Sequence, residues 1–169
     1  MTIIRLYNEI TDAQAVGVLI AETYRKYNLD FASPEEQGKL LGPFLYAGSD
    51  DPVHREAIIN VLRTEMVFVA EDGDQIVGVL RCKPNRLQSL FVREDYHRRG
   101  IGRQLVERCE QECAQRGSKS IHLAATLYAV PIYQAVGYKK STGIRSGWSF
   151  GGRGLKYQPM KKVLVVRHR

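Results

Sequence analysis

Cysteine is scarce in this sequence, and long apolar runs are missing from it. Three cysteines among 169 residues are an odd number, which argues against the disulfide framework of many small secreted proteins. No segment has the roughly 20 consecutive apolar residues that a membrane-spanning helix needs. Because the N-terminus also lacks an apolar signal segment, we expect a cytoplasmic protein that does not bind membranes.

Spacings typical of metal sites are absent too. Cys109 and Cys113 lie four residues apart on an expected helix, on the face that carries its apolar residues, so we expect them in the core. His54 and Glu56 form a His-x-Glu pair, but the Pro-Cys-x-x-Cys partner of zinc deaminases is absent. None of the four histidines is spaced to complete a metal site with the cysteines (His54, His97, His122 and His168). The sequence therefore predicts no metal cofactor.

Positive charge is in excess but is not concentrated. The net charge of +7 comes from 25 lysines and arginines against 18 acidic residues, spread along the chain. Such an excess favours an anionic ligand, whereas a nucleic-acid arm would gather the basic residues in one run. We therefore expect an anionic small molecule and no nucleic acid as partner. The length and the hydrophobic content of 44% predict one domain over residues 1–169.

Hydrophobic periodicity and turn residues predict alternating strands and helices. We expect strands at residues 2–7, 66–71, 75–81, 87–92, 121–125, 138–144 and 157–166. We expect a helix after residue 11, a short helix with loops over 31–51, and helices at 53–63, 101–116 and 129–136. Thr11 with Gln14 is the expected capping box, and Gly117 the expected end of a helix. This order predicts an α/β fold, with a central mixed β-sheet flanked by helices on both faces.

The segment from Leu90 to Leu105 reads LFVREDYHRRGIGRQL, a strand end, a charged turn and the start of a helix. Gly100 and Gly102 carry no Cβ, so backbone N–H groups can approach an anion closely, and the helix start adds unpaired amides. Three arginines supply full charges at the same place (Arg98, Arg99 and Arg103). The Gly-Lys-Ser/Thr of a P-loop and the third glycine of a dinucleotide fingerprint are both absent. The motif predicts phosphate binding; as an alternative, it is a turn with solvated arginines.

This strand, loop and helix resemble the acetyl-CoA pyrophosphate loop of the Gcn5-related N-acetyltransferases, whose pattern is Gln/Arg-x-x-Gly-x-Gly/Ala. His97 stands where the first Gln or Arg is common. Residues 126–138 are similar to a second segment of that family, which has an Asn, an Ala, a Phe/Leu-Tyr pair and a Gly-Phe or Gly-Tyr. Thr126 replaces the Asn, and Tyr133 belongs to the pair. The element order also matches.

The resemblance implies an acetyl-CoA-dependent N-acetyltransferase in which the amine attacks the thioester directly in a ternary complex. The acceptor would be a primary amine of a small molecule, amino acid derivative or peptide. Phe91 and Val92 would present backbone N–H groups to the coenzyme and its carbonyl, and Tyr133 would be the general acid for the thiolate. The implied coenzyme-binding residues are Phe91, Val92, His97, Arg98, Arg99, Gly100, Ile101, Gly102, Arg103 and Thr126. A non-catalytic acyl-CoA-binding sensor or interaction module is the alternative.

The general base is not assigned by the resemblance. Arg86 stands where several members carry an acid, and in the cleft it would favour an acceptor with a carboxylate or phosphate. The candidate bases are His122, Glu22, Glu65 and Glu71, unless the enzyme uses none.

A basic and aromatic segment over 142–158 carries the only tryptophan, Trp148. It is consistent with a hairpin that gates the acceptor, with the contact of a homodimer, or with a solvated hairpin.

Overall fold

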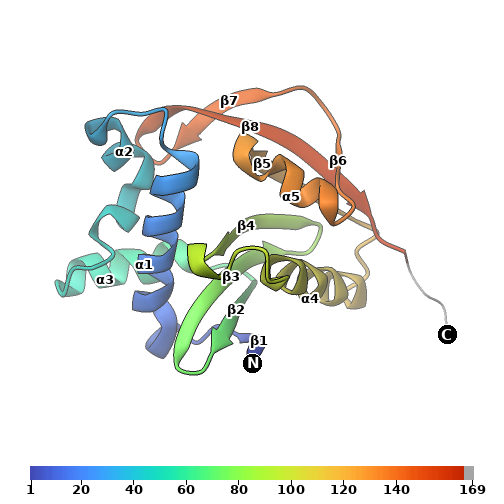
Figure 1. The fold of residues 1–169 in the computed structure, drawn as a ribbon, viewed down its shortest axis with the longest axis horizontal. Coiled ribbons are helices and arrows are strands. Elements are labelled where there is room, and N and C mark those ends of the chain that lie inside the picture. The colour runs from blue at the N-terminus through green and yellow to red at the C-terminus, as the bar shows by residue number, and fades with distance from the viewer. Residues whose placement is uncertain (166–169) are drawn as a thin grey trace.

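The computed structural model describes residues 1–165, in which a mixed β-sheet lies between two layers of helices (Figure 1). The strands are β1 (Thr2–Leu6), β2 (Met66–Asp72), β3 (Gln75–Lys83), β4 (Arg86–Val92), β5 (Ser120–Thr126), β6 (Lys139–Lys140), β7 (Arg145–Ser149) and β8 (Gly152–Val163). The helices are α1 (Glu9–Asn28), α2 (Pro34–Leu41), α3 (Pro52–Leu62), α4 (Ile101–Gln115) and α5 (Val130–Ala135). Short 3₁₀ helices are η1 (Gly42–Tyr46), η2 (Glu94–Tyr96) and η3 (Leu127–Ala129).

The sheet has the strand order β1-β2-β3-β4-β5-β8-β6, and β7 pairs with β8. Within residues 1–165, only the β4–β5 pair is parallel; the other pairs are antiparallel. One hydrophobic cluster joins the sheet to α1, α2 and α3, and a second joins its other face to α4 and α5. The expected fold, a mixed sheet with helices on both faces, is confirmed. Among the described residues, no helix has both the length and the apolar composition that crossing a bilayer requires.

The start of α1 differs from the expected capping box. Asn8 is the N-cap, and its side chain accepts hydrogen bonds from the N–H groups of Ile10, at 2.9 Å, and Thr11, at 3.3 Å. The expected Thr11 and Gln14 box is therefore wrong, because Asn8 supplies the capping oxygen three residues earlier. The helix expected to end at Gly117 is confirmed: α4 ends at Gln115, and Gly117 has the left-handed φ of +88°.

The C-terminal strands also differ from expectation. The predicted strand 138–144 is reduced to the two residues of β6, and the expected glycine-rich connection instead forms the β7–β8 hairpin. Gly152, at the start of β8, packs so closely on α2 that an added Cβ would lie 2.5 Å from Leu40 Cγ. Long-range pairing and packing thus decide these boundaries, which local propensity does not reveal. Val166, at the end of the other predicted strand, and His168 lie outside the described residues.

A partly buried ion pair joins β1 to α1. Asp12, only 4% exposed, accepts hydrogen bonds from Arg5 Nη1 and Nη2 at 2.7 and 3.0 Å and from the Asn8 N–H at 2.7 Å. Burial of the carboxylate raises its pKa, but the Arg5 guanidinium and the Asn8 N–H outweigh this and lower the pKa of Asp12 below its usual value. The ionised pair therefore stabilises the fold, and its contribution is lost when Asp12 is protonated.

We expect Asp12→Asn to reduce the free energy of unfolding at pH 7 by about 1 to 3 kcal/mol, because hydrogen bonds to a charged group are lost. Since the folded state lowers the pKa of Asp12, the contribution is complete above the unfolded value of about 3.9 and disappears as the pH falls further. Urea unfolding at pH 7 and at pH 3 would measure this, with the exposed Asp30→Asn as control. If the free energy of unfolding differs between wild type and Asp12→Asn as much at pH 3 as at pH 7, the ionised Asp12 carboxylate is not the source of this stability.

Candidate active site

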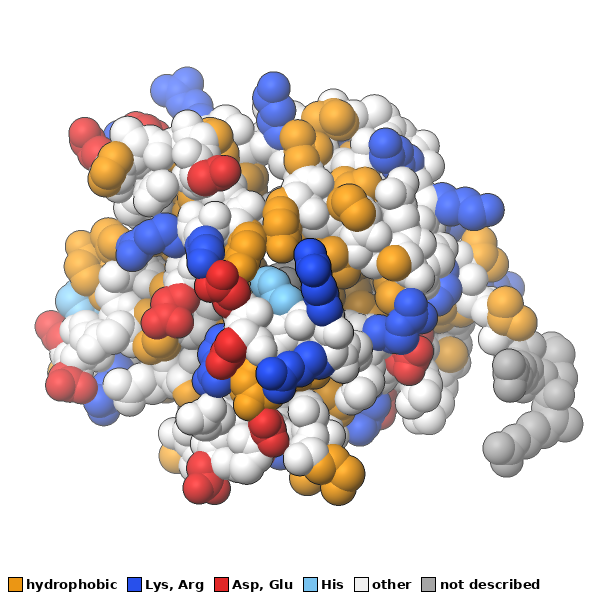
Figure 2. Space-filling model, in the orientation of Figure 1, with side chains coloured by type: hydrophobic (Ala, Val, Ile, Leu, Met, Phe, Trp, Pro, Cys, Tyr) orange, Lys and Arg blue, Asp and Glu red, His pale blue; other side chains and the backbone are white. Residues whose placement is uncertain are grey.

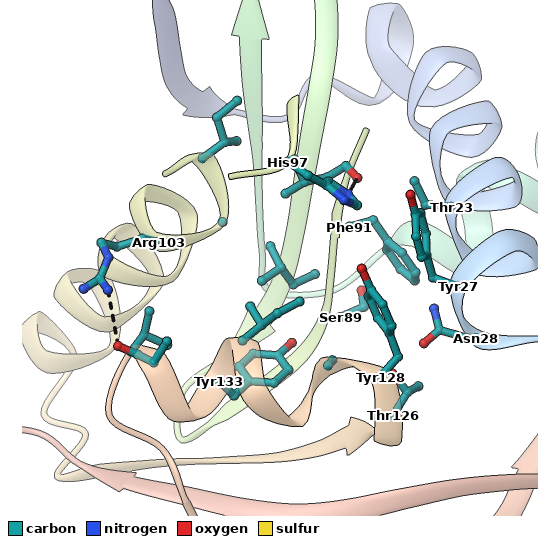
Figure 3. A pocket seen from close by; sticks show the side chains of 18 of the residues that line it. Thr23, Tyr27, Asn28, Ser89, Phe91, His97, Arg103, Thr126, Tyr128 and Tyr133 are labelled. Atoms are coloured by element: carbon teal, nitrogen blue, oxygen red, sulfur yellow. Dashed lines mark hydrogen bonds between the residues drawn. The ribbon is translucent and has the colours of Figure 1, made fainter. Parts of the chain in front are cut away.

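A cleft opens where β4 and β5 part. Their parallel pairing is limited to Arg86 with His122, next to the hydrogen bond from the His122 N–H to the Asn85 carbonyl at 2.9 Å. Towards the C-terminal ends of these strands lies a cleft of about 490 Å³. Its walls come from β4, the C-terminal half of α1, the glycine turn before α4, the end of β5, η3 and α5 (Figure 3).

The register of β4 decides which backbone groups face this cleft. The Arg93 N–H donates to the Val77 carbonyl at 2.8 Å, so in the alternating antiparallel ladder Phe91 also bonds to β3. The N–H groups of Leu90 and Val92 therefore point to the β5 side. The backbone N–H groups of Phe91 and Val92 were both expected to face the coenzyme. The register agrees for Val92 but not for Phe91, whose N–H group points to β3 while its side chain lines the cleft. The β3–β4 register shifts between Arg81 and Cys82, and this shift determines which N–H groups of β4 point to β3 and which to β5.

The turn before α4 adopts the conformation that an anion-binding loop needs. Arg98 and Gly100 have left-handed φ values of +63° and +79°, and no side chain caps the first amides of α4. Gly102 lies on the first turn, where an added Cβ would be 3.9 Å from the side chains of Leu90 and Val92. The free amides and the positive end of the helix dipole can therefore bind an anionic group in the cleft.

Basic side chains flank this end of the cleft. Arg98 and Arg103 line it, and Arg103 Nη2 donates to the Ala135 carbonyl at 3.2 Å. Arg99 does not line the cleft; its guanidinium lies over the Tyr96 ring at 4.8 Å. Figure 2 shows basic side chains beside the hollow in the middle of this face. The structure therefore brings together all the sequence-predicted coenzyme residues except Arg99.

His97 supports the end of β4. Its Nε2 lies 2.6 Å from the Val92 carbonyl oxygen, and since a carbonyl only accepts, Nε2 is the donor. The ring packs against Tyr27 of α1 with 5.2 Å between centroids. His97 thus lines the cleft while holding the strand that forms its floor.

Tyr133 of α5 faces the cleft from the side opposite α1, with its hydroxyl directed into the space (Figure 3). The side chain is 6% exposed and packs edge-on against Tyr138 at 5.8 Å. Burial, with a smaller effect of charge on Cys109, raises the pKa of Tyr133 well above that of a free phenol. The hydroxyl is therefore protonated at neutral pH and available as a donor. Thr126, at the end of β5, also lines the cleft.

The wall formed by α1 and the middle of β4 is polar but carries no charge. The Asn28 side-chain oxygen and the Ser89 hydroxyl are buried and have no hydrogen-bond partner within the described part of the chain. Thr23, by contrast, already donates to the Leu19 carbonyl at 2.6 Å. Tyr27 packs on Tyr128 with 4.9 Å between centroids, across from Ser89 (Figure 3). Unpaired buried oxygens are costly, so this wall is suited to a ligand that donates hydrogen bonds.

The residues considered as bases or acceptor contacts lie elsewhere. None of Arg86, His122, Glu22, Glu65 and Glu71 lines the cleft. Arg86 is exposed at the closed end of the β4–β5 pair, and Glu71 is bound to Arg5. The described cleft lining contains no carboxylate. Conversely, sequence reasoning missed Tyr27, Asn28 and Ser89, because no motif distinguishes them.

Comparison with known proteins agrees with this geometry. Residues 50–164 match the family model described as the acetyltransferase (GNAT) domain, which covers more than half of the chain. The chain belongs to the GNAT family. No curated protein matches this GNAT sequence.

Solved GNAT structures share the whole architecture. A GCN5-related N-acetyltransferase from Rhodopseudomonas palustris superimposes with a TM-score of 0.76 at 21% identity, covering 97% of this chain and 96% of that one. PaiA N-acetyltransferase from Thermoplasma acidophilum, in complex with coenzyme A, gives 0.73 at 16% identity and coverages of 97% and 99%. The ribosomal-protein-S18-alanine N-acetyltransferase from Escherichia coli gives 0.63 at 17% identity and coverages of 99% and 97%. At these identities the likeness shows the fold.

Proposed function

We propose that this GNAT protein transfers the acetyl group of acetyl-CoA to a primary amine of a small molecule, an amino acid derivative or a peptide. The observation that carries the proposal is the continuous cleft from the glycine turn, along the unpaired side of β4, to the hydroxyl of Tyr133. It combines an anion site at one end, backbone amides in the middle and a protonated phenol beside them. These are the groups that acyl transfer from a phosphorylated thioester requires.

The donor half of the cleft suits coenzyme A. The pyrophosphate would lie on the amides of Gly100 and Gly102, with Arg98 and Arg103 beside it. The pantetheine would extend along β4, where the N–H groups of Leu90 and Val92 have no strand partner. A preorganised N–H group there can stabilise the negative oxygen that forms when the thioester carbonyl is attacked.

The chemistry is a direct displacement in a ternary complex. The neutral amine nitrogen forms a bond to the thioester carbon, the carbon–sulfur bond breaks, and the Tyr133 hydroxyl gives its proton to the departing sulfur. The nitrogen loses one proton to solvent as it becomes the amide nitrogen, and a proton from solvent restores the Tyr133 hydroxyl. Burial raises the pKa of Tyr133 and so keeps its hydroxyl protonated at neutral pH, with a proton to give to the departing sulfur. Since the described cleft lining contains no carboxylate, the amine reacts after losing its proton to water.

We expect Tyr133→Phe to lower kcat by about 10²- to 10⁴-fold, the usual contribution of a general acid, while the Kd of coenzyme A changes less than about twofold. Thiol release from acetyl-CoA across a panel of amines, with mass detection of the acetylated product, would measure it. Unchanged turnover would remove Tyr133 from the mechanism. Tight coenzyme binding without transfer to any amine would favour the non-catalytic acyl-CoA-binding module instead.

We expect Gly100→Ala to weaken coenzyme A binding about tenfold. An L-residue held at a φ of +79° is strained by about 1 to 2 kcal/mol, and the turn can relax only by moving the amides that meet the pyrophosphate. Gly117→Ala is the matched control: it lies at the other end of α4 with a φ of +88° and equally open space around an added Cβ. Calorimetric titration with coenzyme A would compare them. Equal loss of affinity in both variants would point to general destabilisation.

We expect Asn28→Ala and Ser89→Ala each to raise the KM for the amine acceptor about tenfold, because a hydrogen bond worth about 1.5 kcal/mol is lost. The KM for acetyl-CoA should stay constant. Thr23→Val is the control, since the Thr23 hydroxyl is already bound within α1 and should leave the acceptor KM unchanged. Steady-state kinetics at saturating acetyl-CoA would test this. An effect on the acetyl-CoA KM alone would place these residues on the donor side.

A further inference from the structure

All three cysteines of the chain meet at one point of the core. Cys82 comes from β3, and Cys109 and Cys113 come from adjacent turns of α4. Each has an exposed fraction of 0%, and the three sulfur atoms all lie within 4.8 Å of one another. The expected burial of Cys109 and Cys113 is confirmed, and the tertiary structure brings a third sulfur beside them from a strand far away in sequence.

The distances suit one metal ion held by three thiolates. A metal–sulfur bond in thiolate sites is about 2.3 Å, and three sulfurs arranged around an ion at that length are about 4 Å apart. This spacing lies within the observed limit of 4.8 Å. A small contraction between β3 and α4 would therefore bring all three sulfurs into bonding distance, without a change of fold.

The ligand set selects the class of ion. Within the described part of the chain, no histidine or carboxylate joins the three sulfurs. Calcium and magnesium need oxygen ligands, and a closed structural zinc site takes four ligands. Soft thiolates select soft ions, and a dry site with three sulfurs suits monovalent copper.

We propose that Cys82, Cys109 and Cys113 form a buried three-thiolate site for a soft metal ion of the monovalent copper class. On binding, three S–H bonds break, the protons pass to solvent, and three metal–sulfur bonds form without electron transfer. Because the sulfurs are closed off from solvent, the ion enters as the chain folds or when α4 opens locally. Once bound, it ties α4 to β3, and this role is independent of acetyl transfer.

The test is thermal unfolding of the protein with and without one equivalent of monovalent copper, under reducing and oxygen-free conditions. An ion that binds the folded state raises the unfolding midpoint, by about 5 °C or more for a tight site in a chain of this size. Cys82→Ala and Cys109→Ala should lose this rise. Val106→Ala, buried on the same helix at 1% exposure, should be destabilised by itself but keep the rise.

Two results would overturn the proposal. An unfolding midpoint that copper leaves unchanged or lowers in the wild type would show that the folded protein offers no tighter site than the unfolded thiols. An equal rise in all variants would place the ion elsewhere. If a cysteine variant fails to fold, the wild type is titrated by thiolate-to-copper charge-transfer absorption, with Val106→Ala as comparison. Saturation of this absorption at one copper ion per chain in both proteins supports the site. A titration that reaches no defined endpoint contradicts it.

Discussion

The separation of β4 from β5 is the constraint on which the functional part of the structure depends. The two strands pair at a single position, Arg86 with His122, and then diverge. Beyond it, the N–H and carbonyl groups of β4 that face β5 have no strand partner, which a closed core would not tolerate. Under the proposed function, the extended pantetheine supplies that partner as an added strand would. The gap in the sheet thus becomes a binding site for a long, amide-containing ligand.

The helices on the two sides of this gap make its two ends chemically different. The glycine turn and α4 bring free amides and the charges of Arg98 and Arg103, whereas α1 brings the uncharged groups of Tyr27 and Asn28. Under the proposed function an anionic ligand would bind at the α4 end, because the other wall offers hydrogen-bonding and aromatic groups without compensating charge. Tyr133 lines the same cleft, and under the proposed function it gives its proton when the bond between coenzyme and acyl group breaks.

Helix α4 serves the core as well as the cleft. Its first turn lies at the anion site, while its later turns pack Leu105, Val106 and the two helical cysteines on the sheet. Cys109 lies in the same hydrophobic cluster as Tyr133, so α4 and α5 pack into one core beneath the cleft. The proposed thiolate site and the proposed acetyl-transfer site therefore share one rigid support, although they differ in chemistry.

The sequence by itself determined most of the order of strands and helices, up to the C-terminal hairpin, and the place of the glycine turn between β4 and α4. These depend on local information: hydrophobic periodicity, the turn at Asp72 to Asp74, and glycines such as Gly100 that adopt a left-handed φ. Only the tertiary structure decided which amides of β4 face the cleft, since a single register shift reverses the alternation of a strand. It also decided that Asn28 and Ser89 line the same cleft, and that Cys82 joins the helical cysteines. Those groups are far apart in the chain, and their meeting is a property of packing that no local pattern records.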